Sequence, residues 1–234
     1  MKKLFVFIAV LAFLLPVQSL HSQVLSEKAK RKFTVGADVF TDLWQVTKQT
    51  PYVPAGFDTR TINQGATAFF MYNFLFGESL SAFSLGLAIR NHNLYSNSIV
   101  ENIKADTIMY TRVSDYLSGE GNYRRSKINT VYLDLPIEVK IRTEKGFKLV
   151  VGFKVGYLID SKQKYVGDRP GDIKGVKFKE KKVNRLEKWA YGATLRVGYK
   201  WISVYGYYQF SKMFQKSLGP DIYPVSLGIT IAPF

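Results

Sequence analysis

The sequence has 234 residues, which is enough for one domain with a sizeable core or for one small membrane barrel. It contains no cysteine, and His92 is its only histidine after residue 22, which excludes disulfide bonds and zinc sites built from cysteine and histidine. The formal net charge of +15 and the 15 tyrosines favour contact with an anionic membrane surface over nucleic acid, for which the chain has no recognisable binding motif.

The first residues have the layout of a secretory signal peptide. Lys2 and Lys3 form a short positive region, the apolar run Leu4–Leu15 follows, and Pro16 ends it. This run is shorter than the roughly 20 residues that a membrane-spanning helix needs. We therefore predict a signal peptide over residues 1–22, cut near Ser22–Gln23 or after Ser19, a short periplasmic segment over 23–32 and a barrel domain over 33–234.

Three segments with apolar residues at every second position follow. Such alternation is typical of a strand with one face against lipid and the other toward a barrel interior. Asp38, Asp42 and Arg90 fall on the inward faces. The predicted strands are Phe33–Trp44, Gln64–Phe76 and Ala82–His92.

The alternation is clearest over Val131–Arg142, where six aliphatic residues take one face and four charged residues lie on the other. A helix would mix these two sets. A turn at Thr143–Gly146 joins this strand to the next, Phe147–Asp160. Pro136 lacks the amide hydrogen that a strand ladder needs, which predicts a bulge or a strand end at that position.

Three further strands bring the number to eight. They are predicted over Trp189–Lys200, Ile202–Phe210 and Ile222–Ile231. Short connections at 77–79, 143–146 and 200–201 alternate with long ones at 45–63, 93–127, 161–187 and 212–221, as periplasmic turns and outer loops do in outer-membrane barrels. The predicted fold class is all-β, an eight-stranded antiparallel up-and-down transmembrane β-barrel. A soluble lipocalin-like barrel is the alternative, and the many small residues of the inward faces argue against it.

Three parts of the chain resemble a known family: the signal peptide, the segment Tyr132–Lys140 (YLDLPIEVK) and the closing residues Ile229–Phe234 (ITIAPF). They are similar to the PorT-like outer-membrane β-barrel proteins of the Bacteroidetes, over about Phe33 to Phe234. The resemblance implies an eight-stranded barrel in the cell outer membrane. It also implies that Phe234 is the signal by which the barrel-assembly machinery recognises the chain. Because the namesake branch is tied to protein secretion, service in an export assembly is one expectation.

The interior of an eight-stranded barrel is just wide enough to be filled by side chains. The inward positions of this chain carry charges of both signs, and buried charges need partners. We expect them to pair across the lumen and close it, with a narrow proton or ion path as the alternative. No metal or other cofactor is expected. The charged lumen residues are Asp38, Arg90, Asp134, Glu138, Lys140, Lys154 and Arg196.

His92 carries the one enzymatic hypothesis. A histidine and a serine on one strand face can form a hydrolase pair, and some outer-membrane lipid A deacylases use such a pair on a barrel. Ser96 lies four residues from His92, whereas those enzymes have the closer spacing His-x-Ser-Asn. The alternative, which we favour, is that His92 is a polar residue at the outer rim and that the protein is not an enzyme.

The predicted loop after the fifth strand is strongly basic, because residues 161–188 hold ten Lys or Arg against four Asp or Glu. Facing outward, it is expected to contact the phosphates of lipopolysaccharide, unless it is merely a solvated loop. The lysines proposed for this contact are Lys177, Lys179, Lys181 and Lys182.

The longest predicted loop, 93–127, is expected to form a raised hairpin that continues the strands on either side. Its tyrosines and a nearby tryptophan would anchor a partner: Trp44, Tyr95, Tyr110, Tyr116 and Tyr123. The sequence thus predicts a non-enzymatic outer-membrane barrel with a closed lumen, acting in surface recognition or as a subunit of an envelope or export assembly. Its expected partners are outer-membrane lipid, the barrel-assembly machinery and other envelope proteins. A lipid A hydrolase and a narrow channel are the alternatives.

Overall fold

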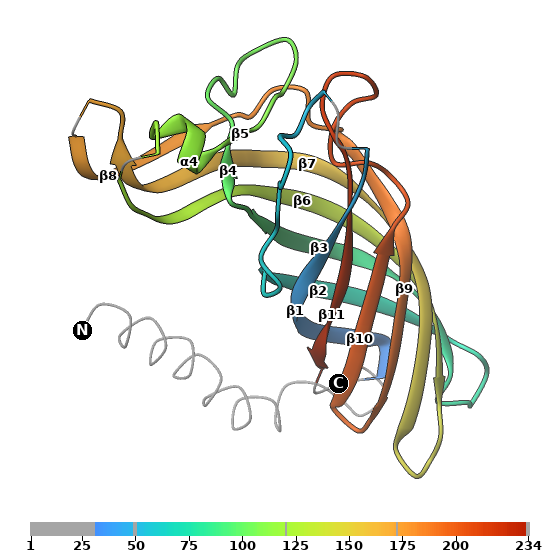
Figure 1. The fold of residues 1–234 in the computed structure, drawn as a ribbon. Helices are drawn as coiled ribbons and strands as arrows, with labels where there is room; N and C mark the ends of the chain where they lie inside the picture. Colours follow the sequence, from blue (N-terminus) through green and yellow to red (C-terminus); the bar gives the residue numbers. More distant parts are fainter. Residues whose placement is uncertain (1–30, 49–50, 120, 172, 233–234) are drawn as a thin grey trace.

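The computed structural model describes residues 31–48, 51–119, 121–171 and 173–232 (Figure 1). The predicted signal peptide, most of the segment 23–32 and the predicted assembly signal Phe234 lie outside these residues. In the described part of the chain, no helix is both long enough and apolar enough to cross a membrane.

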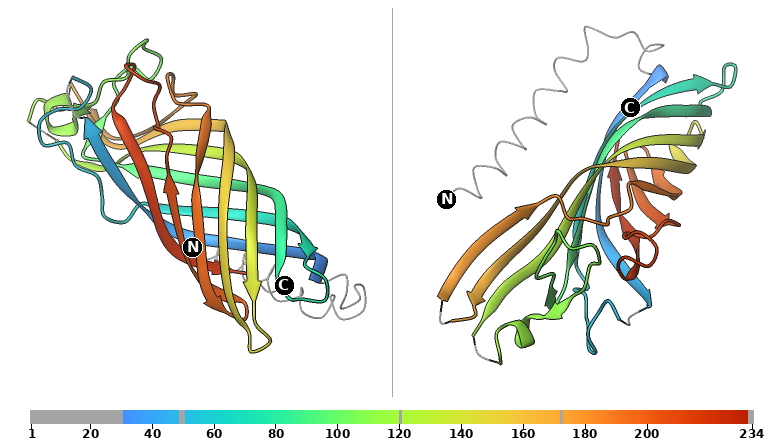
Figure 2. Two further views of the ribbon diagram at one scale, coloured as in Figure 1. Left: turned by 90° about the vertical axis from the view of Figure 1, so that its right-hand side faces the viewer. Right: turned by 90° about the horizontal axis from the view of Figure 1, so that it is seen from above.

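Eight long antiparallel strands form the wall of the molecule (Figures 1 and 2). They are β1 (Phe33–Lys48), β2 (Gln64–Leu75), β3 (Ala82–Tyr95), β6 (Tyr123–Arg142), β7 (Phe147–Arg169), β9 (Trp189–Tyr199), β10 (Ile202–Gln209) and β11 (Asp221–Ile231). Each pairs with the next of these eight along the chain, and β11 pairs back onto β1. The ring is therefore closed, which confirms the predicted eight-stranded antiparallel barrel.

Four further elements lie at the end of the barrel where the long connections gather (Figure 1). They are β4 (Ser98–Ile99), β5 (Thr111–Arg112), the short helix α4 (Val113–Tyr116) and β8 (Ile173–Lys181). β8 pairs with the far part of β7, and both project with β6 well beyond the barrel, as Figure 2 shows.

The ends of the strands differ from the prediction at this same end of the barrel. β6 begins at Tyr123 instead of Val131, and β7 continues to Arg169 instead of ending at Asp160. Most of the predicted loop 161–187 and both ends of the predicted loop 93–127 are therefore sheet. The expected hairpin between β3 and β6 is short, since their pairing ends at Tyr95 and Lys127, and the longer projection is formed by β6, β7 and β8.

Pro136 produces neither a bulge nor a strand end, contrary to the prediction. It lies in the middle of β6 and is paired with Lys154 of β7. On its other side, the ladder with β3 omits the pairs at Leu135 and Pro136 and resumes in the same register. The missing amide hydrogen thus interrupts one ladder locally, while the long ladder with β7 holds the strand in place.

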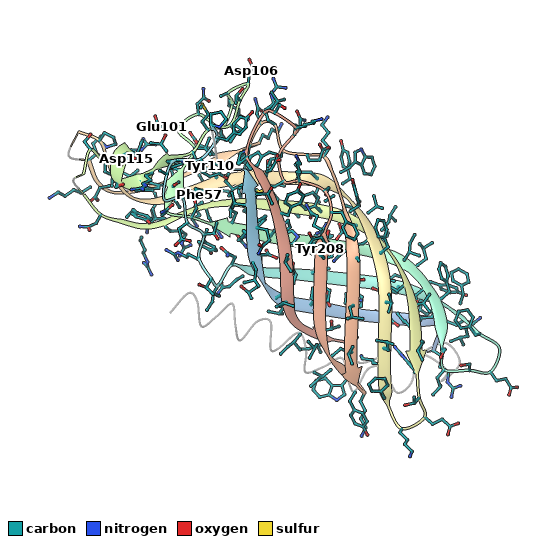
Figure 3. All side chains as sticks on the ribbon, turned by 45° about the vertical axis from the view of Figure 1, so that its right-hand side comes forward. Phe57, Glu101, Asp106, Tyr110, Asp115 and Tyr208 are labelled. Atoms are coloured by element: carbon teal, nitrogen blue, oxygen red, sulfur yellow. The ribbon has the colours of Figure 1, made fainter. Side chains whose placement is uncertain are left out.

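The two faces of the wall have the arrangement of a membrane protein. Leu87, Leu135 and Val204 project outward and are 54%, 51% and 68% exposed, and aromatic side chains such as Tyr208 share this surface (Figure 3). Inward side chains are buried and mostly polar or small, with a few large apolar ones such as Phe69 and Met71. A soluble barrel would reverse these faces, so the lipocalin-like alternative is excluded.

A hydrophobic core between the outer ends of the strands and the long loops closes the outer end of the barrel. It includes Trp44, Leu94, Tyr110, Phe214 and Ile222. Tyr110 packs edge to face on Phe57, with ring centroids 5.2 Å apart (Figure 3). Two of the expected aromatic anchors, Trp44 and Tyr110, are therefore core residues with 7% and 6% exposure. They cannot contact a partner.

The other three proposed anchors, Tyr95, Tyr116 and Tyr123, differ in how exposed they are. Tyr95 is half-buried, with the cations of Arg60 and Lys127 over its ring. Tyr116 is half-buried against Tyr165. Tyr123, which is 39% exposed at the start of β6, is the one that remains open to contact.

Candidate functional site

Arg90 and Asp134 form a two-point ion pair at the centre of the lumen. The Arg90 Nε and Nη2 atoms donate to the two Asp134 carboxylate oxygens at 2.7 and 3.0 Å, and both side chains are fully buried. The rings of Tyr132 and Tyr207 lie 5.0 and 4.7 Å from the guanidinium carbon. The cation is thus surrounded by its counter-ion and by aromatic faces, which is the environment that a buried arginine needs.

Arg196 forms a second centre nearer the short-turn end. Its Nη2 atom lies 3.0 Å from Asp38 Oδ2, and its Nη1 atom pairs with Glu138. Thr230 donates from its hydroxyl to Asp38 at 2.6 Å. One arginine therefore bridges two acids, from β1 and β6.

The two predicted lumen lysines bind neutral oxygens at short distance. Lys154 donates to the Tyr205 hydroxyl at 2.8 Å and lies 4.3 Å from the centre of the Tyr207 ring. Lys140 donates to Asn73 Oδ1 at 3.0 Å, and its only ion pair within the described chain is a 4.0 Å contact with Glu138. All seven predicted lumen residues lie inside the barrel and are at most 6% exposed. Their pairing is less complete than expected, because Lys154 has no carboxylate at ion-pair distance among the described residues.

His92 belongs to the lumen and not to the rim. Because β3 continues to Tyr95, His92 faces inward with 1% exposure. Its Nε2 atom accepts a hydrogen bond from Arg90 at 2.8 Å, since an arginine can only donate. Nδ1 then carries the proton, which it donates to Asp42 at 2.8 Å. Asp42 also accepts from Ser226 at 2.6 Å.

The structure does not bring His92 and Ser96 together as a hydrolase pair. The Ser96 hydroxyl donates to the carbonyl of Ser98 at 2.9 Å, in the loop layer. Both nitrogens of His92 are occupied inside the barrel, so no lone pair is free to take a proton from a serine. The rim interpretation of His92 is also wrong, because the strand is longer than predicted.

A second candidate site is the outer face of the sheet that β6, β7 and β8 form beyond the barrel. Lys127, Lys164 and Lys179 are direct cross-strand neighbours, as are Lys162 and Lys181. Partners in such pairs project from the same face of a sheet. We call this surface the basic face; it consists of Arg125, Lys127, Lys162, Lys164, Lys177, Lys179 and Lys181.

The opposite face of the same sheet is covered. Tyr165 and Phe178 pack there in a small cluster with Ile99, Val113 and Leu117. These last three come from β4, α4 and the end of that helix, which lies beside the projecting sheet in Figure 1. This cluster covers one face of the projecting sheet, so the lysines of the basic face lie on its uncovered face.

A bulge in β7 puts Lys162 and Lys164 on the basic face. The register of β6 with β7 shifts between Val131 and Tyr132, which leaves Ile159 of β7 without a partner. The extra residue reverses the alternation of β7, so that Asp160, Lys162 and Lys164 continue the lipid-facing side of the wall. The predicted strand ended at Asp160, and the predicted binding residues did not include Arg125, Lys127, Lys162 or Lys164. The period-two spacing of lysines in both 162–164 and 177–181 was the available signal.

Three of the four lysines proposed from the sequence are fully part of the basic face. Lys177, Lys179 and Lys181 are exposed and alternate along β8. Lys182 follows the strand with a φ of 61°, and its amide donates to the carbonyl of Ser161. Lys127 is more restricted: it donates to Asn93 at 2.6 Å, and partial burial lowers the pKa of its ammonium group.

In the described residues, no group of three or more His, Asp or Glu side chains is arranged to hold a metal ion. The fold, the apolar outer wall and the charged interior define a transmembrane β-barrel. A family model described as outer membrane protein beta-barrel domain matches residues 57–215, which are 159 of the 234 residues. The chain belongs to this family, and its place is the outer membrane.

The chain is similar to the attachment invasion locus protein Ail of Yersinia pestis, solved with the heparin analogue sucrose octasulfate, at 12% identity over 86% of this chain and 97% of Ail, with a TM-score of 0.38. It is also similar to two mutants of the Rh. blastica porin, at 9% and 8% identity over 85% of this chain and 99% of each porin, with TM-scores of 0.20. No curated protein matches the chain.

Proposed function

We propose that this protein is a non-enzymatic outer-membrane anchor whose basic face binds the phosphate groups of lipopolysaccharide. One observation carries the proposal: the basic face continues the lipid-facing side of the barrel wall. On β7, the lipid-facing Tyr157 and the lysine at 162 are five residues apart, which is about 17 Å along a strand. The lysines therefore follow the apolar band at the level where anionic headgroups begin.

The charge arrangement of the basic face favours an anionic ligand. Lys164 has Lys127 on one side and Lys179 on the other, and like charges directly opposite in a sheet repel. Asp160 pairs with Lys162 at 3.6 Å and offsets only part of this charge. Phosphates bound between the strands would relieve the repulsion, and each lysine near an anionic surface contributes ~1 kcal/mol.

A closed lumen supports a binding role over transport. Arg90, Asp134 and Tyr205 are fully buried, whereas the lining of a water-filled pore would be accessible. The engaged nitrogens of His92 support the non-enzymatic part of the proposal.

Binding of lipid A by the purified full chain in mild detergent tests the proposal. Two changes, Lys164→Gln and Lys179→Gln, remove neighbouring charges from the centre of the face. At ~1 kcal/mol per lysine, the double variant should bind bisphosphorylated lipid A about 30-fold more weakly. Binding by the wild type should also weaken as sodium chloride is raised, because salt screens exposed charges.

The matched control is the pair Lys188→Gln and Lys216→Gln. Both lysines are exposed at the same end of the barrel, but neither belongs to the basic face. The control should bind lipid A like the wild type, and dephosphorylated lipid A should bind weakly to all three proteins. If both double variants lost the same affinity for lipid A, the loss would follow from net charge alone and would contradict the proposal.

Service as an assembly subunit is a second candidate, favoured by the free edge of β8. In the described chain β8 is the last strand of the projecting sheet and pairs only with β7. Such an edge can accept a strand from another protein. The resemblance to PorT-like proteins suggests an export assembly as the setting. Extraction from outer membranes in mild detergent tests this role: a heat-modifiable species of monomer mass opposes it, and a larger species that a proline in β8 dissociates supports it.

A further inference from the structure

Six aromatic side chains gather on the lipid-facing side of the wall, at the outer ends of β7, β9 and β10. The ring centroids of Tyr157 and Trp189 are 5.1 Å apart. Those of Tyr191 and Phe210 lie 6.5 and 6.4 Å from Phe153. All six side chains are between 39% and 55% exposed. We call this surface the aromatic patch; it consists of Phe153, Tyr157, Trp189, Tyr191, Phe210 and Tyr208, the last of which is labelled in Figure 3.

The aromatic patch lies on the membrane side of the basic face. On β7, Tyr157 precedes Lys162 of the basic face by five residues, and both project from the lipid-facing side of the wall. From Tyr157 to Phe153 the patch covers four residues of the strand, about 13 Å. That distance is within the depth of one leaflet, which is half of a hydrocarbon core of about 30 Å. A lipid whose phosphates lie on the basic face therefore has its acyl chains at the level of the patch.

The aromatic rings are not continued along the wall in the direction of β6. The ladder row through Tyr157 carries aliphatic residues on the next three strands, β6, β3 and β2: Leu133, Ile89 and Ala68. An aromatic girdle that only marks the membrane boundary surrounds a barrel at one level. Rings that touch one another on the side where the basic face begins favour a ligand with both acyl chains and negative charge.

We propose that the aromatic patch binds the acyl chains of a lipid A molecule whose phosphates lie on the basic face. This inference rests on the proposed binding of lipopolysaccharide phosphates and extends that site from the headgroup to the chains. Lipid A carries several saturated chains below its two phosphates. Aromatic rings are rigid and bury a large area, so they bind such chains with little loss of side-chain entropy. Lysines alone select any polyanion, and the patch makes the site selective for an acylated one.

Binding to the purified full chain in mild detergent tests the site with two probes, bisphosphorylated lipid A and its fully deacylated headgroup. The test variant combines Tyr191→Leu and Phe210→Leu, two neighbours whose backbones are joined by a hydrogen bond from the Phe210 amide. Leucine keeps the wall apolar and removes the rings. This variant should bind lipid A about five- to tenfold more weakly than the wild type. It should bind the deacylated headgroup with unchanged affinity, which also shows that the protein is folded.

The matched control combines Tyr72→Leu and Phe74→Leu. These residues are also a tyrosine and a phenylalanine on the lipid-facing side, with ring centroids 4.8 Å apart, but they lie near the short-turn end of β2. The control should bind both probes like the wild type. An equal loss of lipid A affinity in the control would assign the effect to lipid-facing rings in general and overturn the inference. A wild-type dimer that the test variant dissociates would also overturn it, because a second copy would then cover the patch.

The lysine variant with Lys164→Gln and Lys179→Gln separates this inference from the proposed function. Loss of lipid A affinity in both the lysine variant and the aromatic variant supports one joint site. If only the lysine variant loses affinity, the phosphate proposal stands and the aromatic patch is ordinary lipid-facing wall. If only the aromatic variant loses affinity, the phosphate proposal fails, and the joint site fails with it.

Discussion

Gly156 stands directly opposite Asp134 on the neighbouring strands β7 and β6, and the space that its missing side chain leaves is taken by the Asp134 carboxylate. A Cβ at Gly156 would overlap that carboxylate and come within 3.1 Å of Arg90 Nη2. The ion pair between Arg90 and Asp134 therefore requires a glycine at position 156.

Gly156→Ala should destabilise the barrel by about 1–3 kcal/mol, the usual cost of overpacking a filled interior. Gly206→Ala is the matched control on β10, where the nearest atom to an added Cβ is 4.0 Å away. The urea midpoint in detergent measures both, with heat-modifiable migration as the check on folding. Equal midpoints for the two variants would show that the space beside Asp134 is not needed.

The ion pair of Arg90 and Asp134 yields a second prediction. Arg90→Met leaves a fully buried carboxylate without its counter-ion and should cost ~3–5 kcal/mol. Adding Asp134→Leu removes that carboxylate, so the double variant should recover much of the loss. A double-mutant cycle from urea unfolding gives the coupling energy. If the two losses simply add, the pair does not act as a unit.

The membrane-spanning part of the fold could be predicted because lipid and lumen impose opposite demands on alternate residues. That pattern located all eight strands and put Asp38, Arg90, Asp134 and Arg196 inside. It could not give their partners, since pairing across the lumen depends on how strands far apart in sequence are staggered. Asp38 and Arg196, 158 residues apart, meet only in the closed ring.

Beyond the membrane the same pattern fails for a physical reason. There no lipid demands a continuous apolar face, and β8 has only Val176 and Phe178 as apolar residues on its covered face, so its sequence reads as a charged loop. The bulge at Ile159 also reverses the alternation of β7, and nothing in the local sequence requires a bulge there. A one-residue shift moves every later side chain of the strand to the other face. The alternation of β7 before the bulge therefore could not predict the face on which Lys162 and Lys164 lie.

Asp168 joins the tips of the projecting strands and yields a pH prediction. Its carboxylate accepts hydrogen bonds from the amides of Asn122 and Gly175, both at 2.8 Å, and these hold its pKa below the usual range. Because the folded pKa is the lower one, the stabilisation is present above the ordinary carboxyl pKa of about 3.9 and is lost as pH falls through the folded value.

Hydrogen-exchange protection factors, which correct for the intrinsic effect of pH, measure this at the amides of Asn122 and Gly175. Protection should be full at neutral pH and fall below about pH 4. Asp168→Asn should lower it at neutral pH and remove the acid-dependent step. Asp115→Asn, an exposed acid in α4, is the control and should leave both amides unchanged. If Asp168→Asn still loses protection as the pH falls, a group other than Asp168 causes the acid-dependent step.

His92 yields the last prediction, which concerns chemistry. If the barrel does not modify lipid, cells with the wild type, with His92→Ala and with Ser96→Ala should give the same lipid A mass spectrum. The physical reason is that the His92 lone pair accepts from Arg90 and its proton goes to Asp42, so the ring is not free to act as a base.

His92→Ala also removes a partner of Arg90 and of Asp42, so its folding must be shown by heat-modifiable migration before the spectra are compared. Ser96→Ala is the milder change, because the hydroxyl only bridges backbone within its own loop. A deletion strain separates the alternatives: if deletion alters lipid A and both folded variants behave like the deletion, the hydrolase hypothesis is right and the closed-lumen assignment of His92 is wrong. If deletion alters lipid A and neither variant does, the change has another cause, such as the loss of phosphate binding at the basic face.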